Sequence, residues 1–136
     1  MTSVTNTRNS NMKRIAFGLA ALLVTTGMGF AATPAMTAKT PNGNIYTDMK
    51  GMTLYTFDKD EAGKSNCDKK CQAEWPIFKA SATSKAEGDW SVVKNDDGTH
   101  MWAYDGKPLY TYVDDKKAGD MTGDGHGDMW HVVKAR

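Results

Sequence analysis

The chain carries one motif twice, and this repeat restricts the fold more than any other feature. The first copy begins at Gly51 and the second at Gly106, 55 residues later, and the same spacing carries Asp60 onto Asp115 and Trp75 onto Trp130. One such unit cannot bury its own hydrophobic face, so two units are expected to pack against each other. We predict repeats at about 44–78 and 99–133, with Trp75 and Trp130 filling equivalent ends of a shared core.

Short alternating runs of apolar residues, bounded by turn sequences, predict β-strands in both repeats. A three-stranded meander is expected from residues 90–94, 100–104 and 108–113, joined by turns at Asn95-Asp-Asp-Gly98 and Asp105-Gly106. Asn, Asp and Gly favour such turns because they tolerate left-handed backbone. The remaining elements are expected to be a hairpin of 44–47 with 53–57 around Lys50-Gly51, a loop over 79–89, a closing strand at 129–133, and a flexible leader over 32–43.

These patterns predict a mainly β, small single domain of two related antiparallel units over residues 44–134. Within its first repeat, alternation places Leu54 and Thr56 on one face of a strand and Tyr55 and Phe57 on the other. An aromatic face of this kind serves either as a ligand platform or as core, and cross-strand packing favours core.

The first 31 residues are typical of a secretory signal peptide. Lys13 and Arg14 precede the apolar run Ile15–Val24, and Gly29 and Ala31 provide small residues for cleavage before Ala32 or slightly later, near Ala35. A membrane-spanning helix needs about 20 apolar residues, whereas a signal needs about 7–15. We therefore expect cleavage and no stable membrane insertion, with Met12 as a more typical start than Met1.

Charge argues against a nucleic-acid partner. Removing residues 1–31 takes away three of the 17 basic residues and none of the 16 acidic ones, which leaves a formal charge of −2. The remaining basic residues are scattered, and no basic stripe is available to neutralise phosphates.

The order of motifs over residues 44–134 resembles the bacterial family called secreted repeat of unknown function. Its members are described as predicted lipoproteins that share the motif Tyr-x-(Phe/Trp/Tyr)-x-x-Asp. In this chain the motif falls on two sets of residues, Tyr55, Phe57 and Asp60, and Tyr110, Tyr112 and Asp115. The resemblance implies secretion but no settled activity. The cysteine that would carry a lipid is missing here, so we expect a protein of the periplasm or the exterior that is not lipid-anchored.

Cys67 and Cys71 are the only two cysteines. In an oxidising compartment two cysteines four residues apart most simply form a local disulfide, on a short turn or helix. A redox-active pair would prefer Cys-x-x-Cys, and haem attachment needs Cys-x-x-Cys-His. The spacing therefore favours a structural disulfide, and a thiol–disulfide redox partner stays open as an alternative.

The Asp- and Gly-rich stretch from Asp120 to Asp128 is a candidate calcium loop. Asp120, Asp124 and Gly125 match positions of an EF-hand loop, with Asp128 as a further carboxylate. Thr122 and His131 depart from that pattern, and a solvated turn is the favoured explanation of the composition.

Three histidines and three methionines could hold copper in a periplasmic protein. They are His100, His126, His131, Met101, Met121 and Met129. Their spacing matches no ligand motif, so copper is a weaker alternative than calcium.

No catalytic motif emerges from the serines or cysteines. Ser65, Ser81, Ser84 and Ser91 lack the elbow sequence of a nucleophile. The expectation is a non-catalytic domain that binds an unidentified ligand or envelope protein, with periplasmic metal binding and thiol–disulfide exchange as alternatives.

Overall fold

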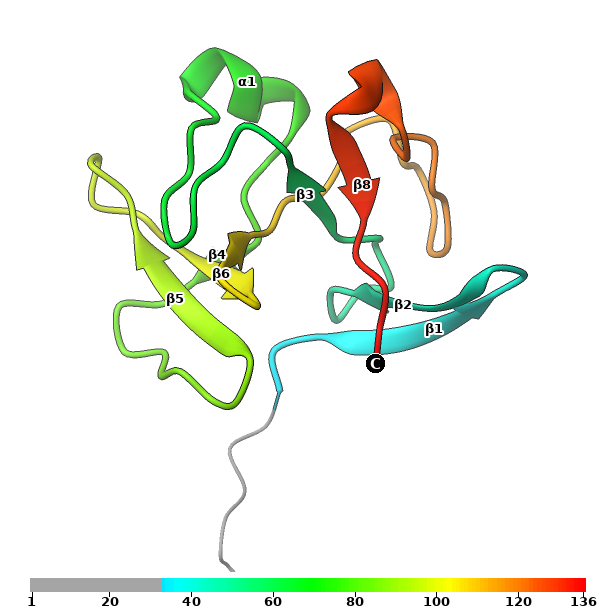
Figure 1. The fold of residues 1–136 in the computed structure, drawn as a ribbon, viewed down its shortest axis with the longest axis horizontal. Coiled ribbons are helices and arrows are strands. Elements are labelled where there is room, and N and C mark those ends of the chain that lie inside the picture. The colour runs from blue at the N-terminus through cyan, green and yellow to red at the C-terminus, as the bar shows by residue number, and fades with distance from the viewer. Residues whose placement is uncertain (1–32) are drawn as a thin grey trace, which may run out of the picture. The chain divides into compact units, whose positions relative to one another are not determined.

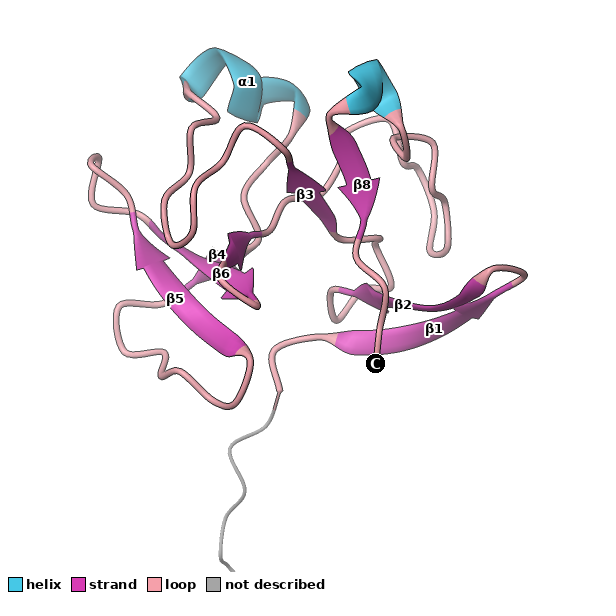
Figure 2. Cartoon of the chain, in the orientation of Figure 1, coloured by secondary structure: helices cyan, strands magenta, loops and turns pink. Residues whose placement is uncertain are grey.

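The chain is mainly β. A computed structural model describes residues 33–136, so the predicted signal peptide at 1–31 lies outside the described residues (Figure 1). Strands and loops make up most of the described part (Figure 2). No helix within it is long and apolar enough to span a membrane. The elements are β1 (Met36–Thr40), β2 (Gly43–Thr47), β3 (Tyr55–Phe57), α1 (Lys69–Glu74), β4 (Lys79–Ala80), β5 (Trp90–Lys94), β6 (His100–Tyr104), β7 (Lys107–Pro108), the 3₁₀ helix η3 (His126–Asp128) and β8 (Trp130–Val132).

Each repeat opens with an antiparallel hairpin. In the first, β1 pairs with β2 from Met36↔Thr47 to Thr40↔Gly43. In the second, β5 pairs with β6 from Trp90↔Tyr104 to Lys94↔His100. β6 also pairs with β4 and β7, so the predicted meander is confirmed, with its third strand shortened to β7.

The prediction of a flexible leader over residues 32–43 is wrong for residues 36–40, which form β1. Most of β1 is exposed, and only Ala38 packs against the core. The strand alternates apolar and polar residues only over Met36 to Lys39 and buries none of them fully, so the pattern that sequence reasoning reads is too short here. Backbone hydrogen bonds to β2 hold it, so the first repeat begins earlier than residue 44.

The strands that follow the hairpins cross from one repeat to the other. β3 of the first repeat pairs with β8 of the second, from Tyr55↔Val132 to Phe57↔Trp130, and the two lie side by side in Figure 1. Between the repeats, the Tyr55 N–H donates to the Tyr110 carbonyl at 2.8 Å and the Tyr110 N–H donates to the Tyr55 carbonyl at 3.0 Å. The two repeats thus contribute one strand each to the two-stranded β3–β8 sheet.

This crossing modifies the expected hairpin of 44–47 with 53–57. Its turn is present, because the Asp48 and Met52 backbones bond at 2.8 Å and Thr47 pairs with Thr53. Beyond the turn, however, residues 55–57 leave β2 and pair with β8. Hydrogen bonding to a partner distant in sequence therefore replaces the local pairing.

The core is divided by strand alternation into two clusters. Leu54 and Leu109 enter one cluster and Tyr55 and Tyr110 the other, and all four side chains are fully buried. Both faces of these strands are therefore covered. This supports core packing for Tyr55, rather than a ligand platform.

Four aromatic rings stack across the junction between the repeats. Trp75 and Trp130 lie parallel with centroids 3.9 Å apart, Phe57 stacks on Trp130 at 4.2 Å, and Tyr112 stacks on Trp75 at 4.1 Å. The expectation that the two tryptophans fill separate ends of the core is wrong, because they meet. Each aromatic pair of this kind contributes about 0.5–1.5 kcal/mol beyond its buried area.

Gly123 provides a test of this stack. An added Cβ would lie 2.6 Å from Trp75 Cη2 and 2.9 Å from Tyr112 Cδ2. We expect Gly123→Ala to lower the free energy of unfolding by about 3 kcal/mol, because overpacking displaces the rings. The control Gly98→Ala meets open space at a positive φ and should cost about 1 kcal/mol. Urea unfolding measures both, and equal losses would contradict the packing described here.

Candidate functional site

The two tyrosines of the repeated motif bond to aspartates of the opposite repeat. The Tyr55 hydroxyl donates to Asp115 Oδ2 at 2.7 Å, and the Tyr110 hydroxyl donates to Asp60 Oδ2 at 2.6 Å. The Asp five residues after each Tyr therefore binds not its own Tyr but the equivalent one. We call these two reciprocal hydrogen bonds the Tyr–Asp clamps.

Each clamp also fixes the loop that follows its aspartate. Asp115 Oδ1 accepts from the Thr122 backbone N–H at 2.9 Å and from its hydroxyl at 2.6 Å. Asp60 Oδ1 accepts from the Asn66 N–H at 2.6 Å. Buried carboxylates need such donors, because an unpaired one carries a large desolvation penalty. The motif is therefore explained as a structural device that joins the repeats.

The clamp tyrosines keep their protons. Burial raises the pKa of Tyr55 and of Tyr110 well above the usual value, and the hydrogen bonds to Asp115 and Asp60 raise each pKa further. Burial likewise raises the pKa of Asp60, although donation from Tyr110 opposes this. Ser65 Oγ lies 2.5 Å from the Tyr110 hydroxyl. Because Tyr110 stays protonated and donates to Asp60, it is not a base for Ser65.

The segment after Asp60 contains the predicted disulfide, which is confirmed. Cys67 and Cys71 are bonded, with Cα atoms 5.2 Å apart. Asp68 caps α1 by accepting from the Cys71 N–H at 2.9 Å, as Asp commonly does at a helix start. The Gln72 amide donates back to the Cys67 carbonyl at 2.8 Å.

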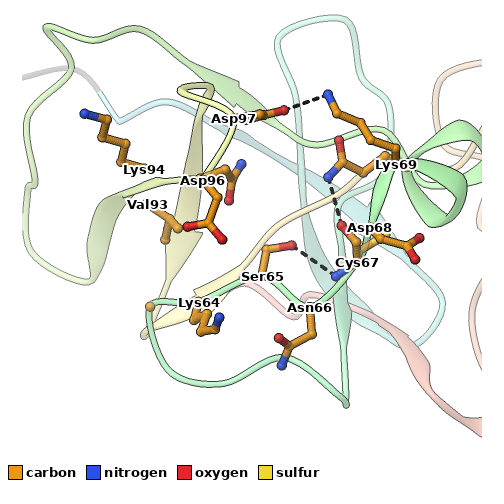
Figure 3. Close-up of a pocket in the computed structure, with 13 residues that line it drawn as sticks. Lys64, Ser65, Asn66, Cys67, Asp68, Lys69, Val93, Lys94, Asp96 and Asp97 are labelled. Atoms are coloured by element: carbon orange, nitrogen blue, oxygen red, sulfur yellow. Dashed lines mark hydrogen bonds and ion pairs between the residues drawn. The ribbon is translucent and has the colours of Figure 1, made fainter.

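A polar groove of about 390 Å³ lies between this segment and the turn of the β5–β6 hairpin. We call it the junction groove, because one wall comes from the first repeat and the other from the second (Figure 3). An ion pair joins the two walls, with Lys69 Nζ 2.6 Å from Asp97 Oδ2. The groove is lined by Gly63, Lys64, Ser65, Asn66, Cys67, Asp68, Lys69, Gln72, Val93, Lys94, Asn95, Asp96 and Asp97.

The formal charges of the groove cancel, since three lysines face three aspartates. Lys69 and the Thr99 donors hold the pKa of Asp97 well below its usual range, so this carboxylate stays ionised. Lys64, Lys94 and Asp96 form no ion pair with any other residue in 33–136. Figure 3 shows the Asp96 carboxylate between Val93 and Ser65.

The groove lies between the two repeats, and its lining residues are not repeated at the 55-residue spacing. At the 55-residue spacing, Cys67 and Cys71 correspond to Thr122 and His126, and Asp96 and Asp97 correspond to Pro41 and Asn42. The clamps and the aromatic stack, in contrast, occur in both halves. None of the groove residues except Cys67 was a sequence-predicted site residue, and this difference between the repeats is the signal that could have identified them.

A second recess of about 290 Å³ is acidic, but its carboxylates already have partners. Asp58 lies 2.8 Å from His131 Nε2, Asp60 binds Tyr110, and Asp105 lies 3.8 Å from Arg136. This recess is therefore a weaker candidate for a binding site than the junction groove.

The candidate calcium residues do not converge. Asp120 Oδ2 accepts from the Lys116 and Lys117 N–H groups, and Asp124 Oδ1 accepts from the Val132 N–H. Asp128 sits at a positive φ of 58°. Among residues 33–136 no three His, Cys, Asp or Glu side chains are placed to hold a metal ion together. The geometry thus gives no support to the metal-binding alternative.

The histidines are dispersed as well. His126 packs edge-on to Trp75 at 5.8 Å, and His131 is exposed beside Asp58. His100 lies on β6 and pairs with Ala80 and Lys94 in the sheet.

The fold and the clamps define a two-repeat β domain whose halves exchange partners. A model of the family described as secreted repeat of unknown function matches residues 36–79 and 91–134. The chain belongs to this family. The two matched ranges are again 55 residues apart. They include β1 and all of β5 except Trp90, which extends the repeats beyond the predicted 44–78 and 99–133. Comparison with curated proteins and with solved structures gives no match.

The clamps predict loss of stability at alkaline pH. Above the ordinary tyrosine pKa of 10.0, the unfolded chain ionises Tyr55 and Tyr110 while the folded chain keeps both protons. Their contribution is complete below that pH and falls by about 1.4 kcal/mol per pH unit for each tyrosine above it. Urea unfolding between about pH 9 and 11 should therefore show a steep decline.

The double variant Tyr55→Phe/Tyr110→Phe should show a flatter decline than the wild type over the same range. Tyr104→Phe is the control, because its hydroxyl accepts from Arg136 at 2.9 Å and belongs to neither clamp. A double variant with the wild-type slope would mean that the clamp hydroxyls ionise in the folded protein.

Proposed function

We propose that the protein is a non-catalytic binding domain of the cell envelope or its exterior, and that the junction groove holds a small polar ligand of little net charge. The observation that carries the proposal is that the groove-lining residues are not repeated in the duplicated fold. Features present in both repeats are explained by folding. The charged groove residues Lys64, Lys94 and Asp96 form no ion pair within 33–136 and are available to a ligand.

The chemistry of the groove favours a neutral or zwitterionic molecule. Its balanced charge gives no strong attraction for a polyanion, and Lys64, Lys94 and Asp96 offer donors and acceptors that no ion pair within 33–136 occupies. Small-molecule sites are concave and use a few convergent polar groups to orient the ligand. Free amino acids, short peptides and sugars have this chemistry.

Location at the envelope is supported by the secreted character of the family and by the disulfide. Disulfides persist in oxidising compartments such as the periplasm and the exterior. We propose that the protein is not lipid-anchored, because no cysteine stands near the predicted cleavage site.

The proposal is tested by thermal unfolding and native mass spectrometry with a panel of free amino acids, dipeptides and mono- and disaccharides. At least one compound should raise the unfolding midpoint and remain bound in the native spectrum, because a ligand that binds only the folded state stabilises it. Asp96→Ala and Lys94→Ala should weaken that binding by about tenfold each, as expected for loss of a direct polar contact.

Lys39→Ala is the matched control, because Lys39 occupies the position of Lys94 in the first repeat and lies outside the groove. This variant should bind as the wild type does. The proposal fails if no compound binds, or if the groove variants and the control bind equally well.

A further inference from the structure

The disulfide belongs to the junction groove and is linked to one of the clamps. Cys67 is 4% exposed, lines the groove and packs in the same core cluster as Tyr110. Its N–H donates to Ser65 Oγ at 3.3 Å (Figure 3). Ser65 Oγ in turn lies 2.5 Å from the Tyr110 hydroxyl. Through Ser65, the disulfide in the groove wall is therefore linked to the Tyr110–Asp60 clamp.

The wall that carries the disulfide is fixed at its two ends, where the Asn66 N–H donates to Asp60 and the Val113 N–H donates to the Glu74 carbonyl at 3.1 Å, and it has few contacts between them. α1 has six residues and none of them is buried. A helix this short is unstable in water without tertiary support. The other attachments of α1 include the Asp68 cap and the Lys69–Asp97 ion pair, in which Lys69 is largely exposed. Exposed ion pairs contribute little to stability.

The second repeat lacks this arrangement. Its clamp is completed by the Gly123 N–H, which donates to the Tyr55 hydroxyl at 3.2 Å, and by Thr122 on Asp115. Reducing the disulfide therefore affects the two halves of the molecule differently.

We infer that the Cys67–Cys71 disulfide is a redox-controlled fastener of the junction groove: it holds α1 in the groove wall. A dithiol that reduces the disulfide releases α1 and opens the groove. The part of this inference that concerns ligand binding rests on the proposed function. The release of α1 itself does not depend on any ligand.

A dithiol reduces the disulfide in two successive thiol–disulfide exchange steps. A thiolate of the dithiol attacks the Cys71 sulfur, which is half-buried and more accessible than that of Cys67. The Cys67–Cys71 bond breaks, a mixed disulfide forms on Cys71, and Cys67 leaves as a thiolate that takes up a proton. The second thiol of the reductant, as a thiolate, then attacks the mixed disulfide at the sulfur of the reductant. Cys71 leaves as a thiolate that takes up a proton, and the two sulfurs of the reductant are joined in a disulfide. Two electrons and two protons pass from the reductant to the protein.

Hydrogen–deuterium exchange of the full chain tests the inference, with the second repeat as an internal control. Residues 61–74 carry the disulfide, and residues 116–129 are their equivalents 55 positions later. With dithiothreitol, or in Cys67→Ser/Cys71→Ser, exchange in 61–74 should accelerate by about tenfold or more. Exchange in 116–129 should change by less than about twofold.

Two results would overturn the inference. Unchanged exchange in 61–74 would show that the disulfide does not hold the wall. Equal acceleration in both segments would show that it stabilises the whole domain and is not a local fastener.

Ligand binding separates this inference from the proposed function. If a compound binds the oxidised and reduced proteins equally and 61–74 stays protected, the redox control fails and the binding site stands. If 61–74 is released and no compound binds either form, the fastener stands and the proposed function fails.

Discussion

The reciprocal hydrogen bonds between Tyr55 and Asp115 and between Tyr110 and Asp60 are the constraint on which the rest of the structure depends. Each buries a hydroxyl that finds its acceptor only in the other repeat. A single repeat would leave a buried tyrosine without its acceptor and half of an aromatic stack exposed. This explains why the two units form one domain, as expected for repeats that cannot bury their hydrophobic faces alone.

The duplication also separates the structural features of the molecule from its candidate functional features. The hairpins, the clamps and the paired tryptophans recur in both halves, so folding accounts for them. Within residues 33–136 the disulfide has no counterpart in the other repeat, and the groove residues Asp96 and Asp97 correspond to Pro41 and Asn42. The position of α1 is taken in the second repeat by the short 3₁₀ helix η3. A feature found in only one copy is not needed for the packing that the two repeats share. We therefore place ligand binding at the groove, and the redox control of that binding at Cys67 and Cys71.

Sequence alone predicted the repeat, the β class and most strands, because these follow from local patterns and from a constant spacing. The Cys67–Cys71 bond was predictable for the same reason, since both residues lie within one turn. β1 was missed because most of its side chains are exposed and it is held by backbone hydrogen bonds to β2, which leave no strong apolar pattern in the sequence. The groove was missed because its walls come from the separate segments 63–72 and 93–97, which meet only in the folded chain, where Lys69 pairs with Asp97.

The partner of each motif aspartate could not be read from the sequence either. Asp60 lies five residues after Tyr55 and fifty before Tyr110, and the repeat is equally regular with either pairing. Proximity along the chain favours the local pair. Tertiary structure selects the distant one, because β3 crosses to β8 and brings the two tyrosines together.

A double-mutant cycle tests this exchange most directly, using Tyr55→Phe with Asp115→Asn and, separately, with Asp60→Asn. If the clamps join opposite repeats, the free energies of unfolding should show a coupling of about 1–3 kcal/mol for Tyr55 with Asp115. Tyr55 with Asp60 should be additive within about 0.5 kcal/mol. A larger coupling for Tyr55 with Asp60 would contradict the account, because it would place each tyrosine on the aspartate of its own repeat.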